Sequence, residues 1–297
     1  MSFNIKKYNN IYLHPHHIIP FSFYPFLVSI FLSYNFLFLA FFLNSGFIFF
    51  YNFYSGFFYI NIIFFFLSLF FWWSEMIEES IVFGHNTKIV NLNFFLGMVF
   101  FIISEIMFFF GFFWAYFHFS LNPSVMIGSC WPPIGITTID YSNLPFFNTL
   151  ILLSSGITIT WSHVSLKSLN VCNYFFIMII TYKKTYMIDY FKLHLVVSMF
   201  ITIFLSFIFL YIQYIEFKYT LFTISDSVYG SIFFCITGLH GFHVFIGTIF
   251  LIISFLRFFL RLVNSNKSSL FEFSVWYWHF VDIVWLFVMM FIYVWGN

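Results

Sequence analysis

Apolar residues run along most of this chain in blocks that are too long for strands and too uniform for soluble amphipathic helices. A membrane-spanning helix needs about 20 predominantly apolar residues, and runs of that length can be laid out as seven spans. The pattern therefore predicts an all-α, polytopic membrane protein with seven transmembrane helices. The approximate limits of the spans are 25–45, 57–81, 91–120, 146–168, 192–217, 227–259 and 271–295.

Short polar breaks separate these spans and suggest how the chain is organised. We expect an N-terminal segment over 1–24, a first helix pair over 25–81 and five further helices over 91–295. The segment 122–145 contains four prolines and cannot run as one helix, so it is predicted to be the longest connection on a polar side. Ser225 or Asp226 is well placed to cap the sixth helix.

The basic residues give the orientation of the helices. With seven spans, ten of the eleven Lys and Arg residues fall on the side of the N-terminus, and only Lys218 falls on the other. An even number of spans would scatter these charges over both sides. Because Lys and Arg accumulate on the side from which a membrane protein is inserted, the asymmetry supports seven spans and an N-terminus on the matrix-like side.

Composition excludes several classes of protein. The chain is 62% hydrophobic and only 7% charged, with a mean hydropathy of +0.97, so most of its outer surface faces lipid. A net charge of +1 and the lack of a basic, aromatic-interleaved run argue against nucleic-acid binding. Cys130, Cys172 and Cys235 are far apart and lack CxxC spacing, which favours packing over a disulfide framework or zinc site.

Phenylalanine occurs 56 times, although Leu, Ile and Val would serve equally well in hydrocarbon. Because Phe, Tyr, Ile and Asn all have codons rich in T or A, we interpret the excess as the mark of a T-rich organellar gene. No Arg-rich amphipathic helix precedes the first span, which fits synthesis inside the organelle.

Glu105 lies in the middle of a predicted span that is otherwise Phe, Ile and Met. An ionised carboxylate there would be costly, so we expect protonation or a close hydrogen-bond partner. Two roles are open, a neutral structural group or a member of a proton relay. A relay needs a continuous path of polar groups or water, and a single carboxyl among Phe residues does not supply one.

Five further polar residues are expected inside spans. His240 and His243 share a helical face at a spacing that can place two imidazoles on one metal. We favour close helix packing with imidazole hydrogen bonds, because Gly238 and Gly241 lie beside them. His279 and Asp282 are also three residues apart, which suits an interhelical hydrogen bond to a common neighbour, and His163 near the end of the fourth span is open to the same interpretations. None of the ten histidines offers the paired spacing of a bis-haem cytochrome, so we predict no redox centre and no metal in this chain.

Several motifs occur in a fixed order along nearly the whole chain. They are Trp72-Trp73-Ser74-Glu75, Gly84-His85-Asn86-Thr87, Ser104-Glu105, Cys130-Trp131-Pro132-Pro133, Thr237-Gly238-Leu239-His240 and Trp278-His279-Phe280-Val281-Asp282. In this order the chain closely resembles subunit III of the haem–copper cytochrome c oxidases, in its mitochondrial form.

The resemblance implies a two-helix bundle and a five-helix bundle around a lipid-filled, V-shaped cleft. The residues that would line the cleft and bind phospholipid are Trp73, Glu79, His85, His243 and Arg257. Trp suits the headgroup level and Arg257 can grip a phosphate. Ser74, Glu78 and Asn86 depart from the family pattern and remove positive charge, which favours a zwitterionic headgroup or a lysine from a partner subunit.

A second departure is an insertion at about 169–191, where the family has a short connection. Its apolar part is too short to span a bilayer, so we expect an excursion on the N-terminal side that lies on the membrane surface or contacts a partner, for which an accessory subunit is a candidate.

The expected function is that of a non-catalytic core subunit of cytochrome c oxidase in the mitochondrial inner membrane. Haem a and copper would reside in partner subunits, with subunit I as the main contact and subunit II and accessory subunits as others. This chain would stabilise subunit I, bind phospholipid and, by resemblance only, shape oxygen access and proton uptake during proton translocation. Two alternatives remain: subunit III of a quinol oxidase, and a stand-alone ion-coupled transporter that uses Glu105. The transporter should show broken helices or an internal repeat around that carboxylate, and the sequence shows neither.

Overall fold

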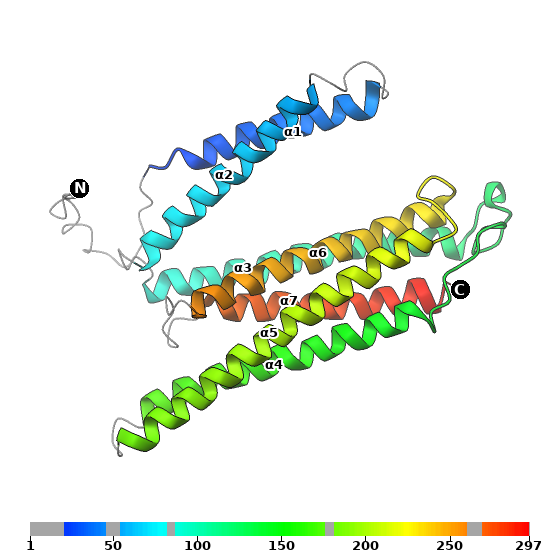
Figure 1. Cartoon of the computed structure of the whole chain (residues 1–297). Helices are drawn as coiled ribbons and strands as arrows, with labels where there is room; N and C mark the ends of the chain where they lie inside the picture. Colours follow the sequence, from blue (N-terminus) through cyan, green and yellow to red (C-terminus); the bar gives the residue numbers. More distant parts are fainter. Residues whose placement is uncertain (1–20, 46–53, 82–86, 176–180, 260–268, 297) are drawn as a thin grey trace. The chain divides into compact units, whose positions relative to one another are not determined.

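The computed structural model describes residues 21–45, 54–81, 87–175, 181–259 and 269–296, and all regular elements in these ranges are helical (Figure 1). The helices are α1 (Tyr24–Ser45), α2 (Tyr54–Ile81), α3 (Lys88–Leu121), the short η2 (Val125–Ile127), α4 (Leu144–Phe175), α5 (Thr181–Tyr219), α6 (Val228–Phe259) and α7 (Ser269–Val288), which continues as the π-helix η4 (Met289–Val294).

Every span expected from the sequence coincides with one helix. In the part of the chain that the structure describes, six helices are long and apolar enough to cross a membrane by length and composition, and the apolar stretch found in α1 is the shorter Tyr24–Ala40. At about 1.5 Å per residue, the 22 residues of α1 extend roughly 33 Å, which matches the hydrocarbon core. The prediction of an all-α, polytopic membrane protein is confirmed.

The chain divides into two compact units, residues 1–94 and 95–297, with the boundary inside α3. In the first unit α1 packs along α2 through stacked aromatic pairs, with ring centroids 4.4 Å apart for Phe38 and Phe58 and 5.9 Å for Phe31 and Phe64. Ser22 donates a 2.7 Å hydrogen bond to Glu75 at one end of this pair.

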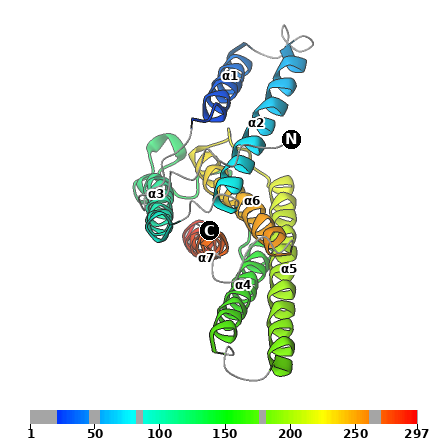
Figure 2. The ribbon, with the colours of Figure 1, turned by 90° about the vertical axis from the view of Figure 1, so that its left-hand side faces the viewer.

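The second unit holds α4 to α7 and most of α3. In Figure 2, α7 is seen end-on among α3, α4 and α6, and its Trp278 and Trp285 are fully buried. Small polar residues of α4 and α5 are buried between helices, and Ser155, Ser162, Ser198 and Thr202 are all inaccessible. Such residues let helix backbones approach closely, which is how helices associate in lipid.

The described residues of the insertion are helical and extend two neighbouring helices. α4 continues to Phe175 and α5 begins at Thr181, and the two helices run side by side over this part (Figure 1). The 39 residues of α5 extend roughly 58 Å, well beyond a hydrocarbon core of about 30 Å. Over the described residues the chain prolongs two spans instead of lying on the membrane surface, and the alternative that the insertion contacts a partner stays a prediction.

The start of α6 differs by one residue from the prediction. The Ser227 hydroxyl accepts a hydrogen bond from the Gly230 N–H and caps the helix, whereas Ser225 and Asp226 lie in the preceding turn. The Asp226 carboxylate accepts hydrogen bonds from the backbone N–H and the hydroxyl of Thr223. These bonds stabilise the ionised form and lower the pKa of Asp226 below its usual value.

Candidate functional site in the membrane-spanning helices

Glu105 on α3 meets His243 on α6. The carboxylate Oε2 lies 2.9 Å from the imidazole Nε2, and the side chains are 21% and 9% exposed. The expectation of a close partner for Glu105 is confirmed. The identity of that partner was not predicted, because the two residues are 138 positions apart and the sequence carries no signal that pairs them.

The other imidazole nitrogen fixes where the protons in this pair reside. Nδ1 of His243 lies 2.7 Å from the carbonyl oxygen of Leu239, which can only accept, so Nδ1 carries a hydrogen. Nε2 then either accepts from a protonated Glu105 or donates to an ionised one. In both cases the contact holds one proton, and both ring nitrogens of His243 are engaged within the chain.

His240 lies one turn earlier on α6 and is fully buried. Its ring packs between Phe209 and Trp285, with centroid distances of 5.8 Å and 5.0 Å. Neither ring nitrogen has a hydrogen-bond partner among the described residues. The expected imidazole hydrogen bonds are therefore present for His243 and replaced by aromatic packing for His240.

The glycines expected to permit close packing at this place are not the ones that do so. In the described part of the chain, a Cβ at Gly238 or Gly241 would meet nothing within 4 Å. At Gly247 a Cβ would lie 3.1 Å from the Trp278 ring, so this glycine sets the approach of α6 to α7. The sequence alone cannot rank glycines on one helix, because the neighbouring helix decides which of them matters.

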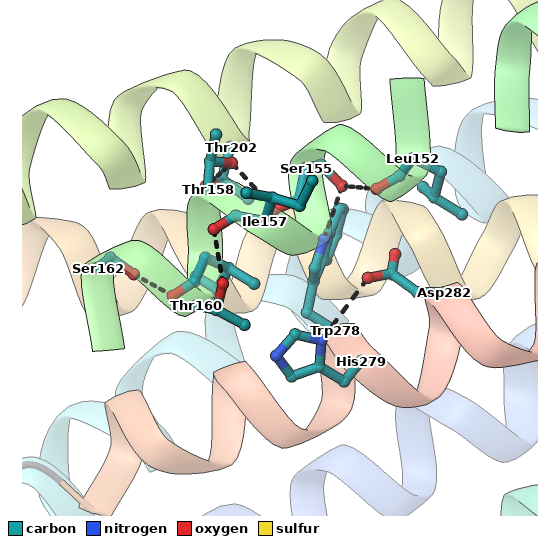
Figure 3. Close-up of polar contacts among 11 residues, drawn as sticks. Leu152, Ser155, Ile157, Thr158, Thr160, Ser162, Thr202, Trp278, His279 and Asp282 are labelled. Carbon is teal, nitrogen blue, oxygen red and sulfur yellow. Dashed lines mark hydrogen bonds and ion pairs between the residues drawn. The ribbon is translucent and has the colours of Figure 1, made fainter. Parts of the chain in front are cut away.

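His279 and Asp282 on α7 share a common neighbour, as expected, and the structure identifies it as α4, but no predicted hydrogen bond joins the pair to α4 among the described residues. The His279 Nδ1 lies 3.7 Å from the Asp282 Oδ2, which is ion-pair range and too long for a hydrogen bond (Figure 3). A Cβ at Gly156 would lie 2.6 Å from the same Oδ2, so glycine makes room for the carboxylate.

These side chains lie in a shallow groove between the two helices, the α4–α7 groove, with a volume of about 350 Å³. Its lining includes Leu153, Gly156 and Ile157 on α4 and His279, Asp282 and Ile283 on α7.

Two interhelical contacts near this groove were missed from the sequence. The Trp278 indole N–H donates a 3.0 Å hydrogen bond to the Ser155 hydroxyl, and the hydroxyls of Thr158 and Thr202 are 2.8 Å apart (Figure 3). They join α4 to α7 and to α5. The run of Ser and Thr along α4 is a sequence signal for such contacts, although it does not name the partners.

A second cluster of buried polar side chains was also missed from the sequence. It lies where α4 begins, where α5 ends and beside η4. The Tyr293 hydroxyl donates to the Glu216 carboxylate, and the Asn148 amide lies 3.4 Å from the Gln213 Oε1. Glu216 is only 3% exposed. Gln213 and Glu216, three residues apart in an apolar helix, are the signal that should have found this group.

The predicted lipid-binding residues fall in both units. Trp73 on α2 is 51% exposed and Glu79 lies near the end of the same helix, whereas His243 and Arg257 are on α6. The Nε of Arg257 is buried and has no hydrogen-bond partner among the described residues. His85 lies outside the described residues, and the lipid site stays a prediction.

His163 on α4 packs beside Phe271 with ring centroids 6.3 Å apart.

Metal-ligating side chains do not gather anywhere in the described ranges. No group of three or more His, Cys, Asp or Glu residues among the described residues could hold a metal ion.

Comparison with known proteins gives one consistent family. The family model described as cytochrome c oxidase subunit III matches residues 14–183 and 177–297, and the two matches meet inside the insertion. "Cytochrome c oxidase subunit 3" of Arabidopsis thaliana is 44% identical over 238 residues, which are 80% of this chain and 82% of that protein. The protein of the same name from Felis catus is 45% identical over 231 residues, 78% of this chain and 80% of its own length. On matches of this identity and extent, the chain belongs to the cytochrome c oxidase subunit III family.

Proposed function

We propose that this chain is a non-catalytic core subunit of cytochrome c oxidase in the mitochondrial inner membrane. The observation that carries the proposal is the match to the subunit III family along both parts of the chain. The helix-buried polar groups support a structural role, because Glu105, Trp278 and Glu216 each engage a side chain of another helix. Oxygen reduction, haem a and copper then belong to partner subunits, above all subunit I.

The role within the complex is to stabilise subunit I and to hold phospholipid. Arg257 supports the lipid part, since it lies in the last turn of α6 and a guanidinium pairs well with a phosphate. By the family resemblance, Trp73, Glu79 and His85 would also bind lipid, with an interfacial ring and groups for an amine or hydroxyl. Shaping of oxygen access and of proton uptake is proposed from the family resemblance alone.

A native gel of gently extracted membranes tests membership in the oxidase. We expect the band that contains this chain to show a-type haem absorbance and to oxidise reduced cytochrome c. Oxidation of a quinol in place of cytochrome c would favour the quinol oxidase alternative. A colourless chain that migrates alone, while other respiratory complexes stay intact, would contradict the proposal and favour the transporter.

The lipid site has its own test in the purified complex. Arg257→Gln should lower the amount of phospholipid retained per haem a, because the guanidinium that grips the phosphate is lost. Lys192→Gln is the matched control, since Lys192 lies toward the same side and contacts Asp189 across an exposed 3.8 Å pair. Equal lipid content in the two variants would contradict the assignment of Arg257.

A further inference from the structure

We propose that the α4–α7 groove is where a transmembrane helix of another oxidase subunit packs, with a hydrogen-bonding side chain directed at His279. The inference rests on the proposed function, because it names the surface through which this chain joins its complex. Three features of the groove carry it: its depth in the membrane, its partly exposed polar pair and its apolar rim.

The polar pair lies at the middle of the bilayer. Gly156 is near the centre of the 26-residue span Leu144–Leu169, and His279 and Asp282 are near the centre of the 26-residue span Ser269–Val294. Interfacial water and headgroups are therefore about half a membrane thickness away, and the hydrocarbon chains at this depth offer no hydrogen bonds.

The pair lacks hydrogen-bond partners among the described residues. The His279 side chain is 36% exposed, and its 3.7 Å separation from Asp282 leaves the contact longer than a hydrogen bond. The other carboxylate oxygen of Asp282, Oδ1, is buried without a partner among the described residues. The Glu105–His243 pair at a similar depth differs, since a 2.9 Å contact joins its two side chains. Ionisable residues at this depth face protein or water, so lipid is a poor occupant of the groove.

The rim of the groove indicates a helix as the occupant. Leu153, Ile157 and Ile283 are 41%, 70% and 54% exposed and surround the polar pair with apolar surface. Gly156 makes room for the Asp282 carboxylate at the floor of the groove, beneath the apolar rim. An apolar helix with one hydrogen-bonding side chain at mid-depth fits both the rim and His279, and Ser, Thr, Asn, Gln or Tyr would serve.

Electron cryomicroscopy of the intact native complex tests the inference directly. We expect a transmembrane helix of another subunit in the groove, with a polar side-chain atom within about 3.5 Å of a His279 ring nitrogen. Ordered acyl chains over His279 would overturn the inference. Coverage of the groove by α1 or α2 of this chain would overturn it equally.

A steric variant tests the same surface in solution. Ile157→Trp adds bulk at a position that is 70% exposed, so the fold of the chain should tolerate it. We expect the fraction of this chain that stays with the haem-containing complex at a fixed detergent concentration to fall about tenfold. The matched control is Ile246→Trp at the 40% exposed Ile246 of α6, which should retain the wild-type fraction. Equal retention of both variants would overturn the inference.

The polar contact is tested by His279→Phe, which keeps a ring and removes both nitrogens, with His194→Phe on α5 as control. Loss of the chain from the complex in the first variant only is the expected result. If His279→Phe behaves as wild type while Ile157→Trp dissociates, the hydrogen bond is refuted. Failure of the proposed function is distinguishable, because the wild-type chain itself would then be absent from the haem-containing band.

Discussion

Individual side chains decide what the apolar helices of this protein can tolerate at mid-membrane. Glu105 and His243 share one proton across a 2.9 Å contact, and the Nδ1 of His243 is fixed by the Leu239 carbonyl. The cost of burying an acid and a base is thus met locally, by two groups that satisfy each other. The pair joins α3 to α6.

Substitution of Glu105 separates the hydrogen bond from the charge. In Glu105→Gln the amide N–H can still donate to Nε2, so we expect stability close to wild type and unchanged proton-pumping stoichiometry. In Glu105→Ala the imidazole is left unpaired, at a cost of roughly 1–3 kcal/mol. Thermal loss of helical circular dichroism in the purified complex measures both, and equal destabilisation by the two variants would show that the hydrogen bond is not the stabilising feature.

Asp226, which lies outside the membrane, should make the stability of the turn before α6 depend on pH. Its pKa is lowered by the hydrogen bonds from Thr223, so the stability it contributes is present above the ordinary carboxyl pKa of 3.8 and is lost as the pH falls through the lower folded value. We expect the turn between Thr223 and Asp226, just before α6, to resist proteolysis equally from pH 8 to pH 5 and to open only below about pH 3.8.

The matched variants for this turn are Asp226→Asn and Asp226→Ala. An Asn amide oxygen accepts a hydrogen bond from the Thr223 N–H and does not titrate. The resistance of the turn to proteolysis in Asp226→Asn should therefore not depend on pH. The Ala variant should be cleaved faster at every pH. A wild-type protein that opens between pH 5 and pH 8 would contradict this assignment.

A few glycines at which neighbouring atoms come close to the backbone help to position whole helices. At Gly230, the second residue after the start of α6, a Cβ would collide with the backbone carbonyl of Thr223, which cannot move without the turn. At Gly238, two turns later, a Cβ would meet nothing within 4 Å in the described part of the chain. The same substitution should thus have opposite effects at two positions of one helix.

We therefore expect Gly230→Ala to destabilise the protein by about 1–3 kcal/mol through the steric clash. Gly238→Ala should be neutral or stabilise α6 by up to about 1 kcal/mol, because Ala is the better helix former. Thermal unfolding of the two variants side by side measures the difference. A Gly238→Ala variant as unstable as Gly230→Ala would point instead to a contact of Gly238 with a partner subunit.

The arrangement of the whole chain across the membrane follows from its helix count and its charges. The connection between α3 and α4 contains the free, partly exposed Cys130 and lies on the side opposite the N-terminus if there are seven spans. Cys235 lies within α6 and inside the membrane. Cys130 is thus a natural reporter of orientation.

A membrane-impermeant maleimide should label Cys130 in mitoplasts, whose inner membrane exposes its outer side, and should leave it unlabelled in inverted inner-membrane vesicles. Labelling after detergent solubilisation of the vesicles is the control for reactivity. Labelling of Cys130 in the inverted vesicles alone would show the opposite orientation. It would contradict the placement of ten basic residues on the matrix side.

The sequence by itself determined the helices, because each membrane span must satisfy its backbone internally and must therefore be a long apolar run. Ordered motifs such as Trp278-His279-Phe280-Val281-Asp282 also determined the family. Only the tertiary structure decided the partners, His243 for Glu105 and Ser155 for Trp278. It also decided that Gly247 and Gly156 are the glycines that lie against side chains of α7. Hydrophobicity is a local property that a sequence records directly, whereas a contact depends on which faces of distant helices meet.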